Sequence, residues 1–136
     1  ALAAMTRSVE IYESLAEADP ARFEPDLALS LNNLSVDLSA SGEAAAALAA
    51  AKRSVEIYQR LAKADPARFE PDLAWSLAHL SDRLREQGML EEALAATQEG
   101  IRLLTPYAET TPGGVAAQRL TALEQDRGSL AAMQKH

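Results

Sequence analysis

The residues best suited to chemistry lie in one short stretch that contains Trp75, His79 and Asp82. His79 and Asp82 are three residues apart, a spacing that places an imidazole and a carboxylate on one side of a helix. Together they could supply two ligands to a metal ion, but a zinc site needs at least three protein ligands. The chain has no cysteine, and its only other histidine is His136. We therefore interpret His79 as a polar lining residue, and we expect no metal and no Ser-His-Asp arrangement.

Motifs for phosphate binding or acid–base catalysis are also missing. Gly113 and Gly114 are adjacent, but the Lys-Ser/Thr pair that completes a phosphate-binding loop does not follow them. Glu91 and Glu92 are neighbours, so they point to different sides of a helix and do not form a catalytic carboxylate pair. The sequence predicts neither catalysis nor a cofactor.

The composition narrows the class of partner. The chain has 136 residues and a formal net charge of −7, which disfavours binding to nucleic acid and to anionic membrane surfaces. No segment approaches the roughly 20 apolar residues of a membrane span. The lack of cysteine excludes disulfides and is compatible with a reducing cytoplasm, where we expect the protein to be. Abundant alanine and leucine with few aromatic residues favour closely packed helices.

One phrase of eleven residues occurs twice. ADPARFEPDLA stands at residues 18–28 and again at 64–74. Residues 1–46 align with residues 47–92 without a gap, and 29 of the 46 positions are identical. A third copy begins at residues 93–104 and then diverges. Identity at a fixed period predicts stacked copies of one supersecondary unit.

Each unit has the pattern of two helices. The first is predicted to begin at Pro25 or Pro71, because proline suits the first helical turn, and to end at Gly42 or Gly88. The whole chain is then predicted to form six helices, at about residues 1–19, 26–41, 43–64, 72–87, 89–109 and 114–133.

The repeated phrase is interpreted as a joint between consecutive helix pairs. Asp19-Pro20 would stop one helix, and Pro25 would start the next. Phe23 and Phe69, the only phenylalanines of the chain, occupy the same place in the two copies. We expect them to act as apolar side chains that seat the joint.

Two segments resemble tetratricopeptide repeats: LSLNNLSVDLSASGEAAAALAAAKRSVEIY and LAHLSDRLREQGMLEEALAATQEGIRLL. The large, small and glycine positions of the family are filled by Leu31, Leu34, Ser35, Leu38, Gly42, Ala47, Ala51 and Ser54. The next copy fills them with Leu77, Leu80, Ser81, Leu84, Gly88, Ala93, Thr97 and Gly100. The unit is 46 residues long instead of the usual 34. In this it is similar to the long-repeat branch that includes kinesin light chain and large bacterial signalling proteins.

The resemblance implies an all-α, right-handed superhelix in a single domain. Residues 1–24 would be the second helix and joint of a truncated repeat, 25–70 and 71–112 would be repeats, and 113–136 a C-terminal capping helix.

In repeats of this kind the first helix of each pair lines the concave side. The residues expected to line a ligand groove are Leu29, Asn32, Asn33 and Val36 in one copy and Trp75, Ala78, His79, Asp82 and Arg85 in the next. The two copies differ most at these positions. The amide of Asn33 would hold the backbone of a peptide, or it bonds within its own helix layer or to water. Trp75 is either a binding hot spot or fills a gap between repeats.

The function implied is a non-catalytic module that binds a protein or peptide segment. One alternative is a structural or self-assembly spacer, with a homo-oligomer formed through exposed repeat ends. The other is a regulatory segment of a larger bacterial signalling protein. Residues 1–46 carry a net charge of −6, which could steer a basic segment of a partner. Most of these charges, however, belong to the solvated face of a second helix.

Overall fold

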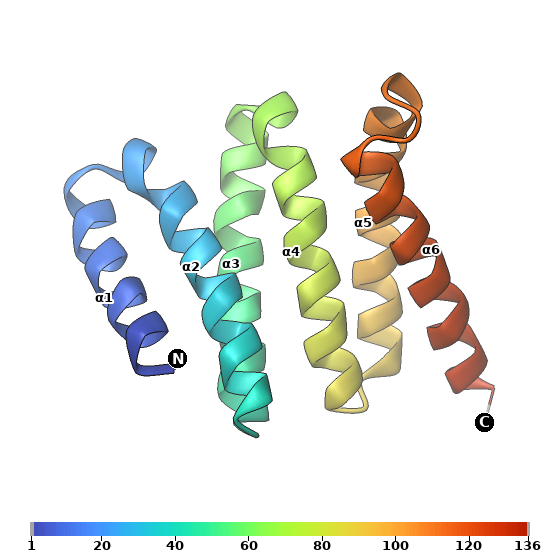
Figure 1. Ribbon diagram of the computed structural model, residues 1–136, viewed down its shortest axis with the longest axis horizontal. Coiled ribbons are helices and arrows are strands. Elements are labelled where there is room, and N and C mark those ends of the chain that lie inside the picture. Colours follow the sequence, from blue (N-terminus) through green and yellow to red (C-terminus); the bar gives the residue numbers. More distant parts are fainter. Residues whose placement is uncertain (1, 136) are drawn as a thin grey trace.

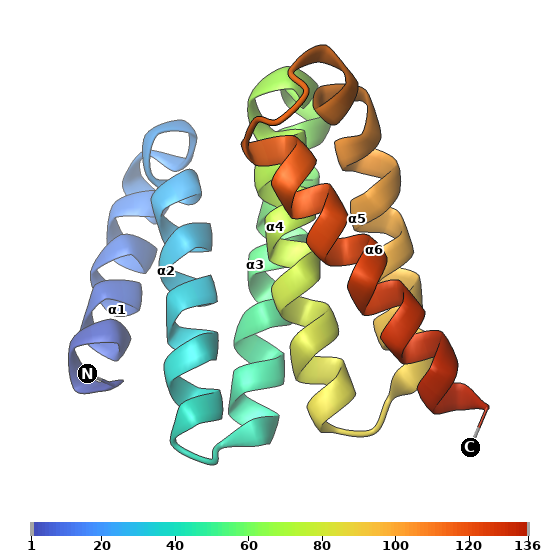
Figure 2. The same ribbon diagram turned by 45° about the vertical axis from the view of Figure 1, so that its right-hand side comes forward.

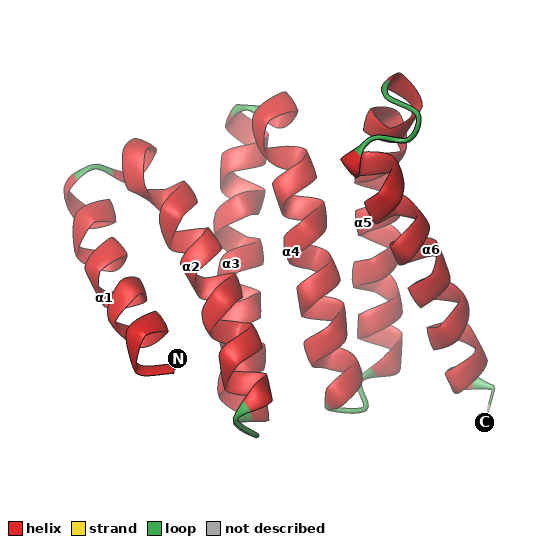
Figure 3. Ribbon diagram, in the orientation of Figure 1, coloured by secondary structure: helices red, strands yellow, loops and turns green. Residues whose placement is uncertain are grey.

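The computed structural model describes residues 2–135; Ala1 and His136 lie outside the described residues. The described chain forms six helices and no strand (Figure 3). They are α1 (Leu2–Ala18), α2 (Pro20–Ala40), α3 (Ala44–Ala64), α4 (Pro66–Glu86), α5 (Leu90–Thr110) and α6 (Val115–Gln134). The prediction of an all-α chain is therefore confirmed.

The helices stand side by side as a row of antiparallel hairpins (Figure 1). Each helix packs mainly against the helices before and after it in the chain. In addition, α2 contacts α4, and α4 contacts α6. These three helices form one side of the stack, which we call the α2–α4–α6 face (Figure 2). The arrangement is the predicted solenoid of helical hairpins.

Small residues at the expected positions let the helices approach closely. Ser35 on α2 donates its hydroxyl to the carbonyl of Ala47 on α3, with 2.9 Å between the oxygens. The same bond recurs 46 residues later between Ser81 and the carbonyl of Ala93, at 3.0 Å. All four residues are buried, and a hydroxyl reaches a neighbouring backbone only when the two helix axes are close. The duplicated small residues thus produce a duplicated contact.

Glycine ends the first helix of each hairpin, as predicted. Gly42 and Gly88 have φ angles of 82° and 77°, in the left-handed region that a side chain disfavours. Each occupies the turn between the two helices of its hairpin.

The repeated phrase is helical, and the prediction that the first helix begins at Pro25 or Pro71 was wrong. Helix α2 begins at Pro20, and only Asp19 separates it from α1. The carbonyl of Asp19 accepts a bond from the amide of Phe23, which starts the helical ladder six residues before Pro25. Pro25 lies inside α2, where it removes one amide donor without ending the helix. Pro66 and Pro71 repeat this arrangement in α4.

The phenylalanines of the phrase pack as expected. Phe69 is buried in the core, and Phe23 is half-buried and packs against the core. The preceding arginines cover the outer sides of the rings: the guanidinium carbons of Arg22 and Arg68 lie 4.9 and 4.7 Å from the ring centroids.

Helix α6 continues the repeat although its letters do not. It packs against α5 and α4 in the way that α4 packs against α3 and α2. Leu123 and Leu130 are buried and stand 46 residues after Leu77 and Leu84, which are buried in α4. Helix α6 therefore takes the place of the first helix of a third unit. Its role as a cap stays a prediction.

Candidate functional site on the α2–α4–α6 face

Two neighbouring pockets open on the α2–α4–α6 face. The α4–α6 pocket has a volume of about 200 Å³ and is lined by Ala74, Trp75, Ala78, His79, Asp82, Leu104, Arg119, Ala122, Leu123 and Asp126. The α2–α4 pocket has a volume of about 390 Å³ and is lined by Pro25, Asp26, Leu29, Tyr58, Asp72, Trp75 and Arg119. Trp75 and Arg119 line both, so the two pockets adjoin.

The α4–α6 pocket arises from two alanines. Between α2 and α4, the hydroxyl of Ser76 donates to Oδ1 of Asn32 at 3.3 Å, and both side chains are fully buried. Ala78 and Ala122 stand 46 residues after Asn32 and Ser76. At the next seam of the stack, two methyl groups therefore replace a hydrogen-bonded polar pair. The missing atoms leave space between α4 and α6.

Trp75, which lines both pockets, forms an aromatic pair with His79. The rings of Trp75 and His79 meet edge to face, with centroids 4.6 Å apart and planes at 84°. The guanidinium carbon of Arg119 lies 5.9 Å from the centroid of the indole ring. Burial lowers the pKa of His79 below its usual value; Asp82 opposes this shift, while Arg83 and Arg119 add to it. The imidazole is consequently neutral at pH 7.

Each pocket contains an aspartate whose pKa is raised mainly by burial. Burial raises the pKa of Asp82, Asp126 raises it further, and Arg85, paired with Asp82 at 3.0 Å, opposes the shift. In the α2–α4 pocket, burial raises the pKa of Asp72 against the influence of Arg119 and Arg68.

The phenol of Tyr58 faces the same negative charge. Its pKa is raised mainly by burial, and also by Asp72 and Asp26. Negative charge thus extends across both pockets.

The residues predicted to line a groove lie at different places in the structure. Trp75, Ala78, His79 and Asp82 line the α4–α6 pocket together. Leu29 lines the α2–α4 pocket, and Asn33 and Val36 are exposed on α2 but line neither pocket. Arg85 lines neither pocket and pairs with Asp82. That they contact a ligand stays a prediction.

The placement of Asn32 on an accessible groove was wrong. Its exposed fraction is 0%, because it lies in the seam between α2 and α4 beside Ser76. A position one residue away from Asn33 along the helix is turned by about 100°, and here that rotation takes it from solvent into the seam.

Among the polar residues that line the two pockets, sequence reasoning missed five: Asp26, Tyr58, Asp72, Arg119 and Asp126. A signal for Asp72 was present, because residues 72, 75, 79 and 82 are spaced by three, four and three and share one helix face. Asp26 has the same relation to Leu29 and Asn33. Arg119 and Asp126 belong to α6, where no repeated letters marked the face.

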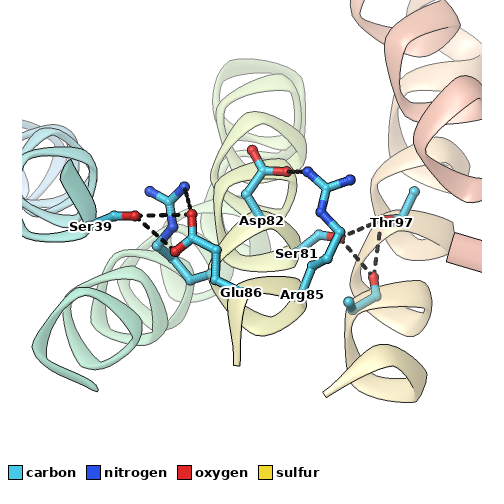
Figure 4. A network of polar contacts seen from close by, with 8 residues as sticks. Ser39, Ser81, Asp82, Arg85, Glu86 and Thr97 are labelled. Atoms are coloured by element: carbon cyan, nitrogen blue, oxygen red, sulfur yellow. Dashed lines mark hydrogen bonds and ion pairs between the residues drawn. The ribbon is translucent and has the colours of Figure 1, made fainter. Parts of the chain in front are cut away.

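A polar network joins α2 and α4 outside the pockets (Figure 4). Ser39 donates to both carboxylate oxygens of Glu86, at 2.9 and 2.8 Å. Glu86 also accepts a bond from Arg83 at 2.9 Å, while Nε and Nη1 of the buried Arg83 have no hydrogen-bond partner among the described residues. Nearby, the hydroxyls of Ser81 and Thr97 lie 2.7 Å apart. Arg83 lines neither the α4–α6 pocket nor the α2–α4 pocket, and we interpret this network as a contact between repeats.

Residues 2–135 contain neither a cluster of metal-binding side chains nor a helix that could span a membrane. Within this part of the chain, no three histidine or acidic side chains are grouped so that they could hold a metal ion. None of its helices combines the length and the apolar character needed to span a bilayer.

Comparison with known proteins agrees with the fold. Residues 27–67 match the family model described as Tetratricopeptide repeat. The matched segment contains most of α2 and all of α3, the hairpin whose small residues form the contacts described above. No curated protein sequence matches the chain significantly. Tetratricopeptide repeats are non-catalytic modules that generally mediate protein–protein interaction. Residues 27–67 thus carry a tetratricopeptide repeat, and the described chain as a whole forms an all-α solenoid.

Proposed function

We propose that this chain binds a protein or peptide segment on its α2–α4–α6 face and has no catalytic activity of its own. One observation carries the proposal. The duplicated units are nearly identical in their core, yet they differ at positions 29, 32, 33 and 36 and at the equivalent positions of α4. Leu29 and the four equivalent residues of α4 line the two pockets, and Asn33 and Val36 are exposed on α2. Asn32 is the exception, because it is buried in the seam beside Ser76.

The physical basis of binding would be a preformed surface. Leu29 and Val36 are 44% and 41% exposed, which is more than most other leucine and valine side chains of the described residues. Asn33 lies between them on the exposed side of α2, where its amide can donate to and accept from a peptide backbone. Because packed helices hold these side chains in place, little entropy is lost when a ligand binds.

The test is affinity capture from a lysate with three forms of the chain. The first is native. The second carries Leu29→Glu, Asn33→Ala and Val36→Glu, all at exposed positions whose change leaves the core intact. The third is a control with Lys52→Glu and Gln59→Glu on the exposed side of α3.

We expect proteins captured by the native and control forms to be lost with the second form. Equal capture by all three forms would overturn the proposal. Circular dichroism melts establish that each form is folded before the comparison is made.

Self-assembly is the second candidate, and an observation on α1 favours it. Ile11 is 48% exposed, whereas Ile57, its counterpart in α3, is 6% exposed because α3 packs between α2 and α4. Leu15, one turn further along α1, is exposed as well. An exposed apolar strip of this kind can pair with another helix. Sedimentation equilibrium of the native chain and of an Ile11→Glu, Leu15→Glu variant tests this role, which requires concentration-dependent mass that the substitutions abolish.

A further inference from the structure

The α4–α6 pocket joins an apolar floor to charged walls. Ala78, Ala122 and Leu123 provide methyl groups, and the ring of Trp75 covers one side. Asp82 enters from α4 and Asp126 from α6. The volume of about 200 Å³ is several times the roughly 30 Å³ of a water molecule, so the pocket has room for a long side chain.

Aspartates outnumber arginines in the two adjoining pockets: the α4–α6 pocket contains Asp82, Asp126 and Arg119, and the α2–α4 pocket adds Asp26 and Asp72. Their lining thus contains four aspartates and one arginine. His79 adds no positive charge at pH 7, because burial lowers its pKa. Asp126 forms no ion pair with any described residue, while Asp82 is paired only with Arg85. The face therefore presents an excess of negative charge around apolar surface.

Resting on the proposed function, we infer that the α4–α6 pocket receives the side chain of a lysine or arginine from the bound segment. The methylene groups of such a side chain cover Ala78, Leu123 and the indole of Trp75, as long basic side chains do on apolar surfaces. The cationic head lies between Asp82 and Asp126 and forms charge-assisted hydrogen bonds. An acidic side chain is repelled here, and an apolar one removes water from the carboxylates without replacing its hydrogen bonds.

Protonation supports the same assignment. Asp126 contributes to the raised pKa of Asp82, which means that the two carboxylates disfavour each other in their charged forms. A cation between them relieves that repulsion.

The first seam of the stack, between α2 and α4, offers no equivalent space, because Asn32 and Ser76 fill it. The basic side chain consequently has one place in the stack.

The experiment measures binding of defined peptide pools to the native chain by fluorescence anisotropy. Each pool contains labelled dodecapeptides that are random except at one central position, fixed as Arg, Lys, Leu, Phe or Glu. We expect the Arg and Lys pools to bind about tenfold more tightly than the other three, a difference of one unit in log Kd.

Two variants link that preference to the pocket. Asp126→Asn removes the unpaired charge and should reduce the preference for basic pools to less than about threefold. Ala78→Asn with Ala122→Ser transfers the closed seam to this position, and should abolish the preference while the fold is kept, because the first seam already accommodates these residues. Glu124→Gln, at an exposed position of α6 outside both pockets, is the matched charge control and should leave the preference unchanged.

The outcomes separate this inference from the proposed function. Binding that prefers Leu, Phe or Glu pools and is lost with the Leu29→Glu, Asn33→Ala, Val36→Glu form overturns the basic side chain alone. A preference for basic pools that survives in the Ala78→Asn, Ala122→Ser variant overturns the assignment to this pocket. Absence of binding by every pool overturns both the inference and peptide binding by this face.

Discussion

The imidazole of His79 packs edge to face against the indole of Trp75, and both side chains line the α4–α6 pocket. An edge-to-face aromatic pair is worth about 0.5–1.5 kcal/mol beyond the area it buries. The pair also holds His79 where solvent reaches it poorly, and this burial is the main cause of its lowered pKa. Packing and protonation at this site are thus properties of one contact.

The free energy of unfolding should fall when the pH is lowered past about 6.5, the ordinary value for histidine. Because the pKa of His79 is lower in the folded chain, the unfolded chain binds more protons between that folded value and 6.5. Stability from this residue is therefore fully present above pH 6.5 and declines as the pH falls toward the folded pKa.

Urea denaturation at pH 7.5 and pH 5.5, with native chain and His79→Gln, isolates this contribution. The native chain should lose more stability between the two pH values than the variant does. An equal loss in both chains would show that His79 is not the group responsible. The raised pKa values of Asp72 and Asp82 act in the opposite direction. The shift of Asp72 does not involve His79 and cancels in the comparison, whereas Asp82 interacts with His79, so the difference between the two chains reports His79 together with its coupling to Asp82.

Substitution by alanine should change the stability of the chain in opposite directions at two glycines, Gly42 and Gly128, although both have open space around them. Gly42 has a φ of 82°, and no atom lies within 4 Å of the position that a Cβ would take. Gly42→Ala should therefore cost only the backbone strain of the left-handed region, about 1–2 kcal/mol. Gly128 lies inside α6 with equally open surroundings, and Gly128→Ala should stabilise the chain by about 0.5–1 kcal/mol through helix propensity. Thermal melts of both variants beside the native chain measure the difference, and the same sign for both would contradict it.

The sequence predicted the hairpins because their signals are local and occur twice. The left-handed turns at Gly42 and Gly88 and the buried serines Ser35 and Ser81 all lie at expected positions. The helix starts were misplaced because Pro25 and Pro20 are both compatible with a first turn. Tertiary packing of Phe23 against the core favours the longer helix.

The site was predicted less completely because it depends on contacts between units. Residues 29, 32, 33 and 36 lie on neighbouring faces of α2, and only the position of α4 determines that Asn32 is covered. The pocket is a consequence of Ala78 facing Ala122, a pair separated by 44 residues in the chain. No local pattern in α6 indicates which of its faces meets α4, so Arg119 and Asp126 could not be assigned in advance.

Gly100→Ala should stabilise the chain by about 0.5 kcal/mol, which is roughly half of the usual gain when alanine replaces glycine in a helix interior. Gly100 stands 46 residues after Ser54, whose hydroxyl bonds to the carbonyl of Ala28. A Cβ at Gly100 would lie 3.0 Å from Cδ1 of Leu123, which is too close without a small movement. Leu123 also lines the α4–α6 pocket, so its side chain can move a few tenths of an ångström into open space.

Chemical denaturation of Gly100→Ala and Gly100→Val tests this adjustment. The valine would also approach the carbonyl of Ala74, which lies 3.5 Å from the Cβ position, and should destabilise the chain by about 1–3 kcal/mol. A loss of stability with alanine as well would mean that Leu123 cannot move.

Replacement of Glu86 should destabilise the chain more than replacement of Arg83, although the two residues form one ion pair. Arg83 is buried, two of its guanidinium nitrogens have no partner among the described residues, and Glu86 supplies its only ion pair there. Glu86→Ala leaves a buried charge uncompensated and removes the acceptor of Ser39, so it should cost about 1–3 kcal/mol, less than a fully buried pair because Glu86 is partly exposed. Arg83→Met replaces the charge with an apolar side chain of similar length and should be neutral or stabilising. Urea denaturation of both variants and of the double variant measures the asymmetry. If Arg83→Met costs as much as Glu86→Ala, the ion pair contributes net stability and the burial of the guanidinium is not a liability.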